Sequence, residues 1–178
     1  DRNRQIDAAK ATLLSEARAI AARQEVLVER AEAILNGLML SAALDASNSS
    51  VDCSAQFAEL LARAADYVQV GVARPDGEVA CSAIAPKDRE TFADRAWFQQ
   101  ALKARAAVVS DVVIGKLVGK PIISVSRAKR DRTDRVVGVY FVALSLEWLG
   151  RAVTDTRLKM GERLAVLEAE NSRLREMH

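Results

Sequence analysis

The chain has 178 residues, of which 50% are apolar and 28% are charged, and its formal net charge is +2. A chain of this length buries one hydrophobic core comfortably, so we expect one domain with extensions. The near balance of 26 basic and 24 acidic residues argues against a nucleic-acid partner and against an anionic membrane surface.

No window reaches the ~18 consecutive apolar residues that a membrane-spanning helix needs, and no signal-peptide pattern opens the chain. We expect membrane attachment only through flanking segments, as in a fragment of a longer protein. The single histidine, His178, stands at the last position, so the sequence offers no metal site, no haem ligand and no Ser-His or Cys-His catalytic pair. No cofactor is expected.

A long helix is predicted over residues 1–44, because this stretch contains no proline, only Gly37, and mostly strong helix formers. Large apolar residues recur every seven positions, which is typical of a coiled-coil seam. We interpret the early part as a homodimer stem and the later part as a helix packed on its own domain. The proposed dimer contacts are Ile6, Leu13, Ile20 and Leu27, and the spacing continues at Ile34.

The polar stretch 46–52 ends this helix, and an amphipathic helix is expected over residues 53–65. Alternating residues 67–73 and residues 78–82 then indicate two strands joined by a turn at Pro75, Asp76 and Gly77. Cys53 and Cys81 lie in the helix and the second strand. They are either two buried thiols or a disulfide, which we favour; a disulfide implies an oxidising compartment.

A second short helix is predicted over residues 94–104, with Asp94 as its cap, followed by strands at 108–114, 121–127 and 136–145. The basic run 127–135 is interrupted by Asp131 and Asp134, which favours a solvated hairpin turn. The links are too short for crossovers, so the five strands form an antiparallel sheet in an α+β fold. Because the last strand is apolar on both faces, we expect helices on both faces of the sheet.

Residues 94–126 also contain the candidate ligand-binding side chains. Arg95 offers a fork of donors that suits a carboxylate, and the Trp97 indole N–H adds another. Ser124 and Ser126 share one face of a strand, and Lys120 precedes them at the expected rim. The alternatives are a surface ion pair of Arg95 with Asp94 or Asp88, and a sheet edge for the two serines.

In the order of its elements and motifs, the chain resembles the Cache sensor domains of bacterial receptors. The motifs are the turn at Asp76 and Gly77, the segment from Asp94 to Phe98, the triplet from Gly119 to Pro121, and the apolar run 138–149. The resemblance covers residues 1–164 and implies a PAS-like fold. It also implies a periplasmic or extracytoplasmic domain of a membrane-bound histidine kinase, diguanylate cyclase or chemoreceptor, in which paired cysteines like these occur.

Amino-acid-sensing Cache domains hold the ligand carboxylate with an Arg-x-Trp-aromatic motif, which this chain matches at Arg95, Trp97 and Phe98. We expect Phe98 to belong mainly to the core, and Tyr140 on the last strand completes the candidate set. The resemblance places Gly115 and Ala143 where those domains carry acidic residues for the ligand ammonium, and Asp111 stands out of place for that role. We therefore predict a small carboxylate or other polar anion as the ligand.

The predicted organisation is a stem helix over residues 1–45, a PAS-like sensor domain over 46–153, and a C-terminal segment over 154–178. This last segment is either a helix with a zipper-like seam or the start of a second Cache unit; helix formers favour the helix. The alternative function is a ligand-free dimerisation module. An enzyme is disfavoured because the sequence offers neither a nucleophile-base pair nor a metal site.

Overall fold

The computed structural model describes residues 2–41, 45–46 and 51–177, so His178 and most of the predicted break at 46–52 lie outside the described residues. The chain forms two compact units. We call residues 26–146 the domain, and residues 1–25 with 147–178 the stem. No helix among the described residues is long and apolar enough to span a membrane.

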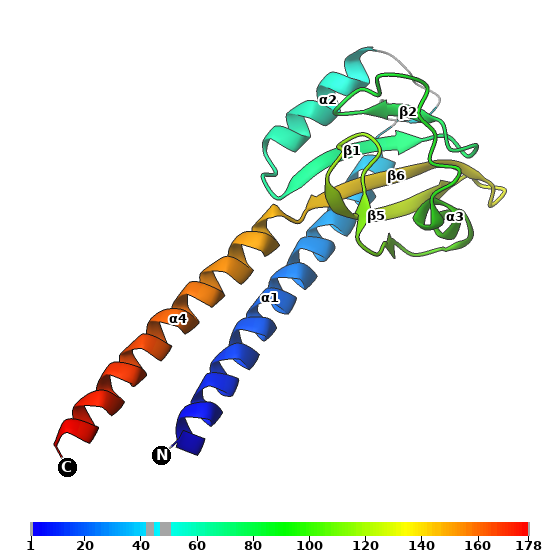
Figure 1. The fold of residues 1–178 in the computed structure, drawn as a ribbon. Coiled ribbons are helices and arrows are strands. Elements are labelled where there is room, and N and C mark those ends of the chain that lie inside the picture. The colour runs from blue at the N-terminus through cyan, green and yellow to red at the C-terminus, as the bar shows by residue number, and fades with distance from the viewer. Residues whose placement is uncertain (1, 42–44, 47–50, 178) are drawn as a thin grey trace. The chain divides into compact units, whose positions relative to one another are not determined.

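A single antiparallel sheet, with strand order β2-β1-β6-β5-β3, forms the centre of the domain (Figure 1). The short strand β4 also pairs with β5. The long central strands β5 and β6 are rich in β-branched and aromatic residues, which favours extended backbone. The strands are β1 (Tyr67–Ala73), β2 (Val79–Ser82), β3 (Val108–Val109), β4 (Val113–Ile114), β5 (Pro121–Arg130) and β6 (Val136–Ser145).

One face of the sheet is covered by the second half of α1 (Arg2–Met39) and by α2 (Val51–Ala62). In this half of α1, the residues Leu27, Ala31, Leu35 and Leu38 are buried at helical spacing. The Tyr67 hydroxyl donates a hydrogen bond to the Leu27 carbonyl oxygen at 2.7 Å. A disulfide joins Cys53 of α2 to Cys81 of β2.

The opposite face carries α3 (Ala96–Lys103) over an aromatic cluster. The ring centroids of Phe92 and Trp97 lie 5.0 Å apart, and Phe92 meets Phe141 of β6 edge-on at the same separation. Gly71 of β1 lies beneath this cluster, where a Cβ atom would fall 2.8 Å from the Phe141 ring and 2.5 Å from the Cys81 carbonyl oxygen. The glycine therefore permits the close packing of β1, β2 and Phe141.

The α+β fold, the antiparallel sheet and the helices on both faces confirm the sequence predictions, but some boundaries differ. The strand predicted at 108–114 is split into β3 and β4, which gives six strands instead of five. At the split, the Ser110 hydroxyl accepts a hydrogen bond from the Ser124 backbone N–H, so between the two short strands a side chain takes part in the pairing with β5. The predicted cap at Asp94 was wrong, since α3 begins after Arg95 and has no side-chain cap.

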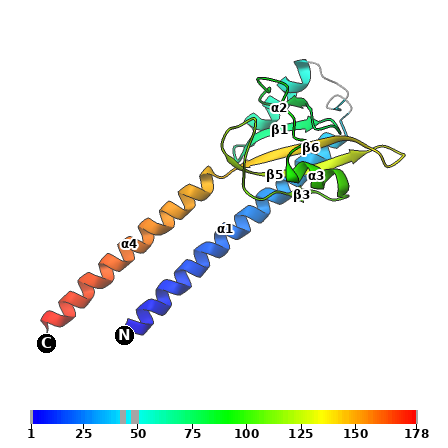
Figure 2. The ribbon, with the colours of Figure 1, turned by 45° about the vertical axis from the view of Figure 1, so that its right-hand side comes forward.

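The stem contains the first half of α1 and the helix α4 (Glu147–Glu176), which run alongside each other (Figure 2). Over its described residues, 154–177, the C-terminal segment is therefore helical as far as Glu176 and contains no strand. Arg163 donates to the Thr12 hydroxyl at 2.6 Å, and the Lys159 amine lies 3.9 Å from the Glu16 carboxylate. Both contacts are exposed and polar, so they contribute little to stability.

Candidate ligand-binding site

A small cavity of about 20 Å³ lies between the start of α3, the strands β5 and β6, and the segment 113–118. All six residues of this segment line the cavity, so they form its cover. Most of the lining side chains are apolar, and they include Ile122, Phe141 and Ala143. A volume of this size holds about one water molecule, so a larger occupant requires the cover to move.

Arg95 and Trp97 both line this cavity, although two residues of spacing puts them on different faces of a helix. They meet there because Arg95 precedes the first turn of α3 and Trp97 lies within that turn. The Arg95 guanidinium is half-buried and makes no hydrogen bond or ion pair with any described residue. The surface ion pair considered for Arg95 is therefore absent from the described part of the chain.

Two further unpartnered donors belong to the cavity wall. The Trp97 side chain is buried against Phe92, and its indole N–H has no acceptor among the described residues. Ser124 is only 2% exposed, and its hydroxyl also lacks a partner within residues 2–41, 45–46 and 51–177. Both residues line the cavity, so an acceptor bound there is within reach of the wall that carries these two donors.

Gln69 also lines the cavity, but its amide is already engaged. Its side-chain oxygen accepts from the backbone N–H groups of Val70 and Ile84, and its nitrogen donates to the Ile84 carbonyl oxygen at 3.0 Å. Gln69 therefore anchors the segment after β2.

Lys116 is a cavity residue that the sequence analysis missed. Its amine donates to the Thr91 carbonyl oxygen at 2.7 Å and forms an ion pair with the Asp94 carboxylate. This hydrogen bond to Lys116 holds the pKa of Asp94 below its usual value. Lys116 thus connects the cover to the segment that carries Arg95.

Four of the predicted ligand-binding residues do not line the cavity. Phe98 is buried in the core, edge-on to Trp97. Lys120 is exposed beyond the cover, while Ser126 is buried one strand repeat past Ser124 and its hydroxyl has no partner. Tyr140 points to the α1 face, because it alternates with Phe141 along β6, and burial raises its pKa to about 12.

Gly115 and Ala143 both lie on the cavity wall. These are the positions at which the resemblance to amino-acid-sensing Cache domains implies acidic residues in those domains. No Asp or Glu side chain lines the cavity, and Asp94 lies outside the lining set. The described part of the chain therefore presents no carboxylate to an occupant's ammonium group. Nor does any group of His, Cys, Asp and Glu side chains in this part suit a metal ion.

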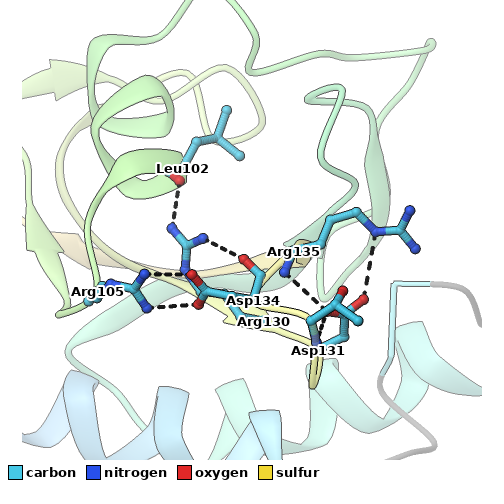
Figure 3. Close-up of polar contacts among 7 residues, drawn as sticks. Leu102, Arg105, Arg130, Asp131, Asp134 and Arg135 are labelled. Carbon is cyan, nitrogen blue, oxygen red and sulfur yellow. Dashed lines mark hydrogen bonds and ion pairs between the residues drawn. The ribbon is translucent and has the colours of Figure 1, made fainter.

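The far end of α3 is fixed to the hairpin between β5 and β6 (Figure 3). Arg105 binds both carboxylate oxygens of Asp134, at 2.7 and 2.5 Å. Arg130 donates to the Leu102 carbonyl oxygen at 2.9 Å and to that of Asp134 at 3.0 Å. Polar contacts thus tie the C-terminal end of α3 to the hairpin, while Arg95 at its start has no such partner.

Solved structures with a similar fold include sensory domains of receptors. One is the extracellular domain of the putative histidine kinase rpHK1S-Z16, with 14% identity, a TM-score of 0.54, and coverage of 86% of this chain and 59% of that one. Another is the ligand-binding domain of the Campylobacter jejuni chemoreceptor Tlp3 in complex with 4-methylisoleucine, with 17% identity, a TM-score of 0.54, and coverage of 85% and 61%.

A third is the ligand-binding domain of the Pseudomonas aeruginosa amino-acid chemoreceptor PctC in complex with GABA, with 18% identity and a TM-score of 0.60. The alignment covers 84% of this chain and 67% of that one. No protein-family model matches the chain, and no curated protein matches it in sequence. The chain spans about three fifths of the length of the first two structures. Its fold is that of the extracellular sensory domains of histidine kinases and chemoreceptors, the Cache-like fold that the sequence predicts.

Proposed function

We propose that the chain is the extracytoplasmic ligand-sensing domain of a membrane receptor, and that its cavity binds a small carboxylate. The observation that carries the proposal is the half-buried Arg95 guanidinium, which has no partner among the described residues. A guanidinium forms two parallel hydrogen bonds to a carboxylate, and such charge-assisted bonds are strong away from water. The free donors of Trp97 and Ser124 support the same ligand chemistry.

The ligand differs from those named for the Tlp3 and PctC domains, because it is not expected to carry an ammonium group. A cationic group buried without a counter-charge is strongly disfavoured. Gly115 and Ala143 offer it no charge, and the neighbouring cavity groups Arg95 and Lys116 are themselves cationic. We therefore expect the cavity to bind anionic acids without an α-amino group.

The disulfide supports a location outside the cytoplasm, since structural disulfides persist mainly in oxidising compartments. The connection of the cavity to the stem supports a sensor role. Phe141 and Ala143 form part of the cavity wall, and β6 continues through Ser145 directly into α4. A ligand that binds one arrangement of β6 better than another would shift the population of states of this connection.

The stem supports a homodimer with a second copy of the chain. Ile6 and Leu13 follow the seven-residue spacing and are 44% and 47% exposed, and Leu164 and Leu174 of α4 are exposed as well. An apolar groove of about 660 Å³ lies between the two stem helices. The predicted dimer contact at Leu27 is corrected, because this side chain is 2% exposed and packs within the domain.

The dimer is tested by Leu13→Glu, with Leu40→Glu as the matched control at an exposed leucine beyond the end of α1. Light scattering of the purified chain should give a dimer mass for the wild type and the control, and a monomer mass for Leu13→Glu. A monomeric wild type would contradict the proposed dimer.

The sensor function is tested by thermal shift with a library of small mono- and dicarboxylates and amino acids. Simple carboxylates should raise the melting temperature of the wild type, and Arg95→Gln should abolish the rise. Arg132→Gln, at an exposed arginine of the β5–β6 turn, is the control that should respond like the wild type. A preference for amino acids would refute the ligand class.

One observation favours a second candidate, a ligand-free dimerisation module. The cavity holds about one water molecule, as a filled interior would. In that case no small molecule would alter the melting temperature, and Arg95→Gln would leave the protein's other properties unchanged. The same library therefore separates the two functions.

A further inference from the structure

The ion pair between Lys116 and Asp94 joins two side chains in very different environments. The Lys116 side chain is only 20% exposed and lines the cavity beside Arg95, whereas Asp94 is 66% exposed and does not line it. Two residues with cationic side chains, Arg95 and Lys116, thus line the cavity, and the carboxylate that pairs with the Lys116 amine is exposed to water. Breaking an ion pair with such an exposed carboxylate costs little free energy, because water solvates the carboxylate well.

A carboxylate inside the cavity would be a stronger partner for Lys116 than Asp94 is. Coulomb attraction between two charges grows as the effective dielectric constant falls, and the cavity is lined mainly by apolar side chains. Lys116 would keep its hydrogen bond to the Thr91 carbonyl oxygen during the exchange. Replacing Asp94 by a ligand carboxylate at the Lys116 amine therefore costs little free energy in contacts within the protein.

The position of Lys116 also relates this exchange to opening of the cavity. The backbone N–H of Gly115 donates to the Lys120 carbonyl oxygen at 3.0 Å, and that of Gly119 donates to Gly115 at 2.7 Å. These bonds join the cover to the turn that follows it and do not reach the segment 91–94. Of the described residues 115–119, Lys116 alone forms side-chain polar contacts outside the cover, and both of its contacts are in the segment 91–94.

We propose that the ligand of this cavity is a dianion with two carboxylates, one bound by Arg95 and the other by Lys116, which exchanges Asp94 for the ligand. The inference rests on the proposed function and names its ligand class more narrowly. Two carboxylates neutralise the two cations of the wall, while a monocarboxylate leaves Lys116 with Asp94. Lys116 is then the residue that selects for the second carboxylate of the ligand. Asp94 competes with that carboxylate for the Lys116 amine.

The test uses two probes of equal size that differ by one charge, succinate and its half-amide succinamate, with glutarate and glutaramate as a longer pair. Calorimetric titration of the purified chain should give a tighter Kd for the diacid of at least one pair, by about 10-fold or more, as expected for one charge-assisted hydrogen bond. Lys116→Gln should remove that preference and leave the half-amide affinity within about threefold. Lys116→Arg should keep the preference.

Asp94→Asn provides a second measurement that does not remove a ligand contact. It should strengthen diacid binding by about two- to fivefold, because the competing exposed carboxylate is gone. Lys120→Gln is the matched control, as Lys120 lies outside the cavity wall; it should leave the ratio of diacid to half-amide affinity unchanged.

Three outcomes would overturn the inference or its basis, and they are distinguishable. Equal affinity of diacid and half-amide in the wild type overturns the dianion and leaves carboxylate sensing intact. Equal weakening of both probes by Lys116→Gln, with the fold retained by circular dichroism, reduces Lys116 to a structural contact of the cover. Absence of binding by every mono- and dicarboxylate in the library refutes the proposed function itself.

Discussion

The two faces of the sheet differ in whether their polar side chains have hydrogen-bond partners. On the face covered by α1 and α2, the buried Tyr67 hydroxyl donates to the Leu27 carbonyl oxygen, and a disulfide joins α2 to β2. On the face covered by α3, the hydroxyls of Ser124 and Ser126 have no partner among the described residues, and neither has the half-buried Arg95 guanidinium. On the face covered by α3, Gln69 is engaged in hydrogen bonds, whereas the side chains of Arg95 and Ser126 are not.

This difference separates the part of the domain that stabilises it from the part that is available to a ligand. Buried polar groups in folded proteins are almost always hydrogen-bonded, because leaving one unpaired costs free energy. Unpaired groups in a folded protein therefore call for an explanation, and a bound ligand is the one that we propose for the cavity. We therefore expect changes on the α1 and α2 face to lower stability, and changes at the cavity to alter binding instead.

The largest expected effect comes from removing the disulfide on the α2 face. Replacing Cys53 and Cys81 together with alanine opens a link across 28 residues, and loop-closure entropy predicts a loss of about 3–4 kcal/mol in the free energy of unfolding. Urea unfolding followed by circular dichroism measures this loss. Carboxylate affinity, measured below the unfolding transition, should remain that of the wild type; a large loss of affinity would show that the two faces are not separate.

The next effect concerns Tyr140, which is buried on the same face. Burial raises its pKa to about 12 in the folded state, from 10.0. The folded state then holds the proton more tightly, so this contribution is fully present below pH 10 and is lost as the pH rises through 12. At pH 11 the expected loss is about 1.4 kcal/mol.

Urea unfolding of the wild type and of Tyr140→Phe, at pH 8 and pH 11, measures this contribution. The phenylalanine variant should lose less stability between the two pH values, by about the same amount. If both proteins lose equal stability, the Tyr140 hydroxyl titrates normally and does not contribute to alkaline sensitivity.

The sequence predicted the fold well where local signals agreed. Strands β1 and β6 have the predicted bounds, because each is rich in β-branched and aromatic residues and is bounded by turn or loop residues. The strand at 108–114 was predicted whole, since its valines favour extended backbone throughout. At its division lies a hydrogen bond between Ser110 and Ser124, which are distant in sequence and which no local pattern brings together.

The site was predicted only in part, for a similar reason. Arg95, Trp97 and Ser124 line the cavity, and their chemistry was visible in the sequence. Tyr140 was assigned to the site because β6 is apolar on both alternating sets, so its sequence does not reveal which set faces the ligand. Lys116 was missed in favour of Lys120, since the contact that distinguishes it, with Asp94, spans 22 residues.

The smallest effect tests the comparison most directly, with one hydroxyl removed from each face. Tyr67→Phe removes a satisfied hydrogen bond and should cost about 1 kcal/mol in the free energy of unfolding. Ser126→Ala removes a fully buried hydroxyl that has no partner, so it should cost nothing or stabilise the domain slightly. Parallel urea titrations of the two variants measure the difference. If Ser126→Ala is as destabilising as Tyr67→Phe, the Ser126 hydroxyl is satisfied in solution, and the contrast between the faces is reduced to the groups that line the cavity itself.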